Sequence, residues 1–167
     1  MLREIDRLGS DEDFDGFYRA QYTRLVRALL LLTGDANDAE DLAQEALARV
    51  FERWERVARM ESPEGYLYRT AFNLRRKETR RLRVRTRRAS DPSLSTRPDP
   101  SLDDRLTVLS AVASLPAAQR EALVLVEWLG FEVKDAAAVL GIRPVSVRSR
   151  LLDARRGLRK RLGGSDG

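Results

Sequence analysis

The chain contains neither cysteine nor histidine in its 167 residues. Without cysteine it forms no disulfide framework and has no thiolate nucleophile, and without both residue types it builds no zinc finger. The lack of histidine also excludes a Ser-His-Asp triad. A Mg²⁺ or Ca²⁺ site made from carboxylates alone is formally possible, but most acidic residues have helical spacing beside polar partners. We therefore expect no catalytic residues, no metal site and no cofactor.

Long hydrophobic runs are also missing. The longest aliphatic run covers only residues 28–32, whereas a helix needs about 20 apolar residues to span a bilayer. The first six residues lack the apolar core of a signal peptide. These features predict a cytoplasmic protein without membrane insertion, and the chain length predicts one mid-sized domain or two small ones.

The charge is distributed in four blocks of alternating sign, although the net value is only +5. Residues 1–62 carry 9 basic and 14 acidic side chains, and residues 63–98 carry 11 basic and 3 acidic ones. Residues 99–142 carry 3 basic and 7 acidic side chains, and residues 143–167 carry 8 basic and 2 acidic ones. Two separate basic blocks indicate two contacts with a polyanion, the alternative being plain solvated faces.

Every strong hydrophobic periodicity is helical, so we expect an all-α protein. Ser10 and Asp13 resemble a cap and predict a first helix to about residue 32, ended by Gly34. Asp35 predicts the start of a second helix that continues to about residue 57. Ser62 followed by proline predicts a third helix, from there to about residue 85 or 88.

A break in the helical pattern divides the chain into two expected domains. Residues 89–103 contain three prolines and four serines, which do not continue a helix and predict a flexible linker. We expect a helical bundle over residues 1–88 and a second bundle over residues 104–167. The second bundle is expected to hold helices near residues 103–114, 116–129, 133–140 and 144–161.

The second bundle carries the pattern of a helix-turn-helix. A short helix with small residues is followed by Gly141 and then by a basic helix that starts with proline, which is the order that a DNA-reading motif needs. We expect Val145, Leu151 and Leu158 to face the bundle. The side chains left to contact bases or phosphates are Arg143, Ser146, Arg148, Ser149, Arg150 and Arg155. The alternative is a helical hairpin with a basic surface.

Two polar surfaces of the first bundle are candidate binding sites. One continues along a flank of the second helix and could receive a basic partner helix; its residues are Asp38, Asp41, Gln44, Glu45 and Arg49. The other lies on the third helix, where Arg69, Asn73, Arg76 or Lys77, and Arg80 recur at steps of three or four. An asparagine among arginines with aromatic residues nearby suits strand-separated DNA. For Phe72 and at least one of Tyr66 and Tyr68, core packing is the favoured interpretation.

These segments together resemble a known family. The segments that carry the resemblance are residues 18–22, 38–45, 50–51, 66–73, 115–121, 138–142 and 146–151. In this order they are similar to successive signatures of bacterial RNA polymerase sigma factors. The arrangement of two domains with a short linker resembles the extracytoplasmic-function (ECF) class of the sigma-70 superfamily.

The resemblance implies roles for the matching positions. The polar flank of the second helix would dock on the clamp helices of the largest polymerase subunit. Arg69, Asn73, Arg76, Lys77, Arg80 and Arg81 would bind the minus-ten promoter element, and the loop over residues 57–62 would hold a flipped base. Arg148, Ser149 and Arg150 would read the minus-thirty-five element. The partners implied are core RNA polymerase, promoter DNA and an anti-sigma factor or other regulator, with the free protein a monomer.

Two departures from the family pattern concern base preference. Asp153 stands where the recognition helix often has an arginine; it would repel a phosphate or accept from a cytosine amino group, depending on its orientation. Val145-Ser146, preceded by Pro144, stands where a Gly-Thr or similar pair is frequent. The alternative function is a stand-alone helix-turn-helix regulator, which would need neither the polar flank nor the Arg69/Asn73 face.

Overall fold

The computed structural model describes residues 2–88 and 104–163, so the expected linker at 89–103 lies outside the described residues. Within those two ranges the regular structure is helical throughout, as the periodicity predicted. No helix in the described ranges is long and apolar enough to cross a membrane.

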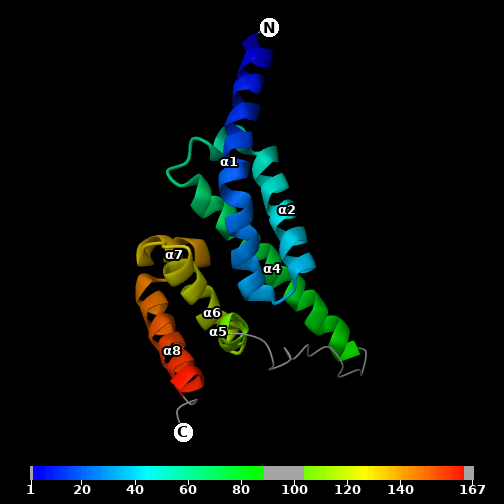
Figure 1. Ribbon diagram of the computed structural model, residues 1–167. Coiled ribbons are helices and arrows are strands. Elements are labelled where there is room, and N and C mark those ends of the chain that lie inside the picture. The colour runs from blue at the N-terminus through cyan, green and yellow to red at the C-terminus, as the bar shows by residue number, and fades with distance from the viewer. Residues whose placement is uncertain (1, 89–103, 164–167) are drawn as a thin grey trace.

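The amino-terminal bundle consists of α1 (Leu2–Thr33), α2 (Ala36–Glu52), the short α3 (Trp54–Val57) and α4 (Pro63–Arg88). In Figure 1, α1 and α2 run side by side and α4 crosses behind them. Two of the predicted caps, at Asp35 and Ser62, are confirmed. The Asp35 side chain accepts from the backbone N–H of Asp38, and the Ser62 hydroxyl accepts from that of Gly65 at 2.9 Å. Gly34 has φ +73°, a conformation that glycine adopts without strain.

Large apolar side chains from α1, α2 and α4 fill the space between these helices. Leu25, Leu47, Tyr68 and Phe72 are almost fully buried, which confirms core packing for Phe72 and for one of the two tyrosines. At one end of the bundle, the Trp54 ring lies 5.0 Å from that of Phe17. The core therefore fixes the outward flanks of α2 and α4.

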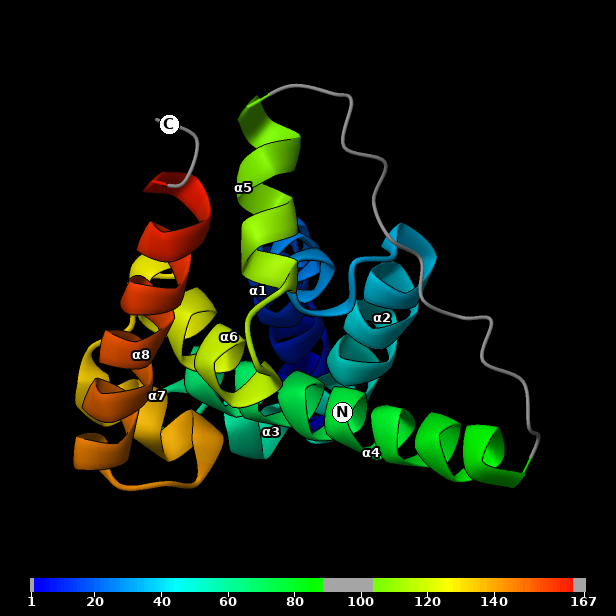
Figure 2. The ribbon, with the colours of Figure 1, turned by 90° about the horizontal axis from the view of Figure 1, so that it is seen from below.

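The carboxy-terminal bundle consists of α5 (Asp104–Ala113), α6 (Ala117–Leu123), the π-helical turn η1 (Val124–Trp128), α7 (Val133–Leu140) and α8 (Pro144–Leu162). Gly141 forms the turn between α7 and α8 with φ +66°. Helices α7 and α8 are thus the two helices of the expected helix-turn-helix. Helix α8 packs against α6 and also contacts α5 (Figure 2).

Four details differ from the predictions. Helix α1 begins at Leu2 and not near Ser10, since Gly9 inside a helix costs only about 1 kcal/mol. The predicted helix to residue 57 breaks at Arg53, whose φ of −120° leaves the helical range. The predicted helix over 116–129 ends in a π-turn, where the Leu129 N–H reaches back to the Val124 carbonyl. Val145 is exposed and Val147 is buried in its place.

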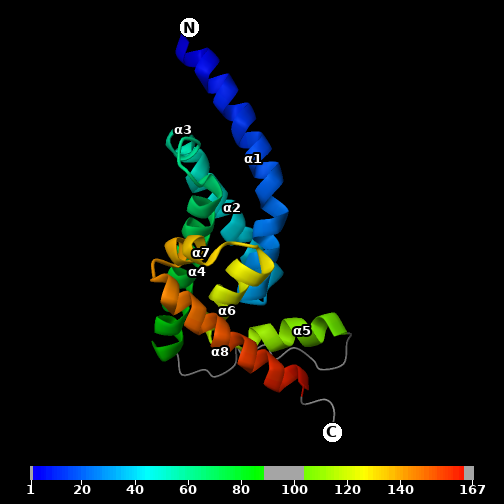
Figure 3. The ribbon, with the colours of Figure 1, turned by 90° about the vertical axis from the view of Figure 1, so that its left-hand side faces the viewer.

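The two bundles pack against each other. Helix α7 lies beside α4, and α5 lies beside α1 (Figure 3). The Tyr68 ring of α4 contacts Phe131, which precedes α7, with ring centroids 5.4 Å apart. Buried residues of both bundles belong to one continuous hydrophobic cluster. The carboxy-terminal bundle therefore covers part of α4.

Candidate nucleic-acid and partner-binding surfaces

The polar flank of α2 is exposed as predicted. Its side chains lie opposite the buried face of the helix, which packs on α1 and α4. The exposed residues are Asp38, Asp41, Gln44, Glu45 and Arg49, and we call this set the α2 strip. Glu45 and Arg49 form an ion pair of 2.8 Å one turn apart. The strip is thus an open surface with an excess of negative charge.

A groove between α2 and α4 holds two of the predicted minus-ten residues. Asn73 and Lys77 line it from α4, and Arg49 and Arg53 line it from α2 and the break after it. The groove has a volume of about 680 Å³. Tyr66 also lines it and receives a hydrogen bond from Arg53. The groove thus brings together amide, cationic and aromatic groups of the kind that bind unpaired bases, together with the carboxylates of Glu45 and Glu52.

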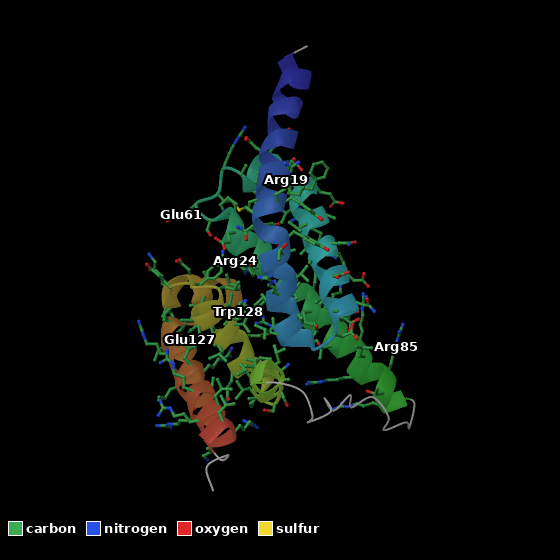
Figure 4. The ribbon with its side chains drawn as sticks, in the orientation of Figure 1. Arg19, Arg24, Glu61, Arg85, Glu127 and Trp128 are labelled. Atoms are coloured by element: carbon green, nitrogen blue, oxygen red, sulfur yellow. The ribbon has the colours of Figure 1, made fainter. Side chains whose placement is uncertain are left out.

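The other predicted minus-ten residues have different surroundings. Arg69 is exposed and lies with Met60 and Ser62 in a second groove, whose other side is lined by α7. The loop predicted to hold a flipped base therefore faces the carboxy-terminal bundle. Arg80 and Arg81 are exposed on the projecting end of α4. Arg85 extends from the same end, away from the carboxy-terminal helices (Figure 4).

Arg76 is already engaged by the other bundle. Its Nε and Nη2 donate to the Glu121 carboxylate of α6 at 3.1 and 2.8 Å, and Arg75 donates to the same carboxylate at 2.6 Å. Burial would raise the pKa of the Glu121 carboxyl, but hydrogen bonds from Arg76 and Arg75 outweigh burial and lower this pKa below its ordinary value. The bond to Glu121 raises the pKa of Arg76. Arg76 therefore lies outside the α2–α4 groove that contains Asn73.

The basic residues of α8 are also divided. Arg143, Arg148 and Ser149 are exposed, while Ser146 is half-buried. Arg150 turns toward the other bundle and lines a groove with Arg76 and Glu121. Arg155 forms an ion pair with Glu127 of the π-turn. Of the predicted set, Arg148 and Ser149 form the outward surface in the amino-terminal third of the recognition helix.

Charged residues of the interface that were not assigned any role from the sequence include Arg75, Glu121, Arg120 and Arg24. Arg75 and Glu121 are 8% and 3% exposed, which is rare for charged side chains and indicates a specific ion pair. Arg120 donates to the Leu32 carbonyl of α1 at 2.8 Å and to carbonyls of residues 113 and 115. Arg24 of α1 forms an ion pair with Glu64 and donates a hydrogen bond to the Leu129 carbonyl. It lies close to Trp128 in Figure 4.

Comparison with known families gives two matches in chain order. Residues 17–87 match the model described as sigma-70 region 2, and residues 105–158 match that of sigma-70, region 4. The first match includes the α2 strip and the α2–α4 groove, and the second includes the helix-turn-helix.

Curated relatives agree with both matches. The RNA polymerase sigma-E factor of Streptomyces avermitilis is 30% identical over 161 residues, covering 92% of this chain and 87% of the relative. The ECF RNA polymerase sigma factor SigL of Mycobacterium tuberculosis is 36% identical over 143 residues, covering 81% of this chain and 80% of the relative.

Solved structures show the same fold. The sigma factor RpoE of Bartonella quintana, in complex with the anti-sigma factor NepR, superposes with a TM-score of 0.80 at 24% identity, covering 91% of this chain and 98% of that one. CnrH, in complex with the cytosolic domain of CnrY, superposes with a TM-score of 0.66 at 21% identity, covering 94% and 91%. With two region matches in order and relatives of this identity and coverage, the chain belongs to the ECF class of the sigma-70 family, the sigma factors of RNA polymerase.

Proposed function

We propose that this sigma factor binds core RNA polymerase through the α2 strip, holds the minus-ten element in the α2–α4 groove and reads the minus-thirty-five element with α8. It acts in the cytoplasm, without catalysis of its own, and is a monomer when free. The amino-terminal unit is residues 1–88, the carboxy-terminal unit residues 104–167, with residues 89–103 as the linker.

One observation carries this proposal. Glu45 and Arg49 belong to the α2 strip and also line the groove that contains Asn73 and Lys77. A polymerase subunit docked on the strip would lie directly beside a DNA strand in the groove. Docking and strand binding would then support each other, which a regulator that binds duplex DNA without polymerase does not require.

Strand opening follows from the same groove. Unpaired bases offer both their π-faces and their polar edges, which Tyr66 and Asn73 could bind, while Lys77 and Arg53 attract the phosphates. Paired bases inside a duplex do not expose these groups in the same way. Preferential binding of the separated strand in the groove would therefore favour the open promoter.

The interface between the bundles limits which promoter contacts the packed protein can make. Arg76 directs Nε and Nη2 at Glu121, so it contacts DNA through these groups only after that ion pair opens. Helix α7 also lines one side of the groove around Arg69, so a DNA strand in this groove would lie against the carboxy-terminal bundle. Full promoter contact therefore requires the two bundles to separate. The RpoE and CnrH structures contain partner proteins, and we propose that an anti-sigma factor or other regulator likewise controls this chain.

A charge reversal on the α2 strip tests the proposal. Asp41→Arg should abolish co-purification with core polymerase, because it places a cation in the middle of the strip. Glu40→Arg is the matched control, since it makes the same charge change about 100° away on the exposed side of α2. Equal polymerase binding by wild type and Asp41→Arg would contradict docking at this surface.

A further inference from the structure

Three large apolar side chains of the recognition helix are exposed, namely Val145 and Leu152 in its amino-terminal half and Leu162 at its last residue. Val145 is 57% exposed and Leu152 is 48% exposed. The inward face of α8 is occupied by others, because Val147, Leu151 and Ala154 are the buried residues of this helix. Neither Val145 nor Leu152 is therefore needed for the core of the carboxy-terminal bundle.

The two side chains share one face of α8. A separation of seven residues is nearly two helical turns and places them about 10 Å apart along the axis. Arg148 and Ser149 lie between them on the same face, and both are exposed. Arg156, one turn beyond Leu152, is exposed as well. The surface is thus a basic, polar strip with an apolar group on each side of its centre.

This composition fits the major groove of DNA. The charge of Arg148 and Arg156 favours a polyanion over an apolar protein surface. Within the major groove, the C5-methyl of thymine is the apolar group by which a base pair is distinguished, and aliphatic side chains contact it. Phosphates and polar base edges offer no apolar group for a valine or leucine side chain to contact. A distance of about 10 Å corresponds to roughly three base-pair steps of 3.4 Å.

We propose that Val145 and Leu152 are specificity-determining residues that contact thymine methyl groups, roughly three base pairs apart, in the minus-thirty-five element. This inference rests on the proposed function, since it requires α8 to read that element. Single exposed apolar residues are common on protein surfaces. The pair is distinguished by its position on either side of Arg148 and Ser149, on the outward face of the recognition helix.

Removing single methyl groups from the DNA tests the contact. Holoenzyme reconstituted with core polymerase is first used to select promoters from a duplex library randomised upstream of the start site. In the selected duplex, each thymine of the upstream element is then replaced singly by deoxyuridine, which lacks only the methyl group. For wild type, replacement at two positions should weaken binding about fourfold each, as expected for one buried carbon.

The variants identify the side chain behind each loss. In the Val145→Ala variant, deoxyuridine at one of these two positions should cause little further loss of affinity. In the Leu152→Ala variant, deoxyuridine at the other position should cause little further loss. Val108→Ala is the matched control: this valine is 49% exposed but lies on α5, so the variant should keep the wild-type sensitivity. Both test residues are exposed, so alanine should leave the melting temperature nearly unchanged.

The possible failures are distinguishable. If holoenzyme selects no sequence at all, the proposed function fails. The inference alone is overturned if promoters are selected but contain no thymine in the upstream element, or if deoxyuridine changes nothing for wild type. It is also overturned if, at every thymine position, Val145→Ala weakens binding by the same factor on the thymine duplex and on the deoxyuridine duplex. That result would assign the surface to a protein partner instead.

Discussion

The Glu121 carboxylate of α6 lies between two arginines of α4, 2.6 Å from Nη2 of Arg75 and 2.8 Å from Nη2 of Arg76. The three residues join helices from the two bundles. Since Arg76 belongs to the predicted minus-ten surface, we propose that the contact couples DNA binding to the packing of the two bundles. A charged contact of this kind depends on all three members, because removing one leaves buried charge without a partner.

Glu121→Gln should therefore loosen the contact between the bundles. Breaking a buried ion pair by removing one partner costs about 3–5 kcal/mol, and we expect a loss near the lower limit because Arg76 is partly exposed. Denaturant unfolding measures the loss, and small-angle scattering should show a larger radius of gyration. Glu127→Gln is the control, since it removes an exposed ion pair within one bundle. Equal effects of the two changes would contradict the assigned role.

The Glu121 contact should also weaken in acid. The Glu121 pKa is lower in the folded protein than in the unfolded chain, where it is about 4.3. Its stabilising effect is thus fully present above that value and is lost as the pH falls through the lower, folded-state pKa. The difference in unfolding free energy between wild type and Glu121→Gln should shrink below about pH 4. A constant difference from pH 7 to pH 3 would exclude ionised Glu121 as its source.

Asn73→Ala should weaken binding of the separated minus-ten strand. A lost hydrogen bond to a base costs about 1 kcal/mol, or roughly fivefold in affinity. Fluorescence anisotropy of a labelled single-stranded promoter oligonucleotide with preformed holoenzyme measures it. The control is Asn37→Ala, an exposed asparagine at the start of α2 that is not among the residues lining this groove. If both variants bind equally well, the α2–α4 groove does not hold the strand.

Arg148→Ala should cost about 1–3 kcal/mol if Arg148 makes a bidentate contact to a base. The loss should be confined to promoters that carry the preferred base. Binding of holoenzyme to a promoter series with single base changes in the upstream element measures this dependence. A uniform loss on every sequence would instead assign Arg148 to a phosphate.

Local features of the fold could be predicted because they depend on neighbouring residues. The caps formed by Asp35 and Ser62 depend on one side chain and the next turn, and Gly34 and Gly141 mark helix ends by their backbone freedom. The exposed α2 strip followed from helical periodicity alone. These features needed no knowledge of how the two bundles meet.

Features that depend on tertiary contact could not be predicted. The expected inward direction of Val145 is a different case, because it misjudged the helical phase: Val147 shares a face with the buried Leu151, whereas Val145 lies about 200° from Val147. The interface role of Glu121 depends on arginines 45 and 46 residues earlier in the chain. Residues 115–121 carried the family resemblance, but no local pattern indicates what Glu121 contacts.

Run-off transcription with core polymerase on fragmented genomic DNA tests the central claim most directly. We expect the wild-type protein to give discrete transcripts whose start sites share two upstream elements, while Asp41→Arg gives none and Glu40→Arg resembles wild type. Failure of the wild-type protein to co-purify with core polymerase, together with no transcript from any template, would contradict the account.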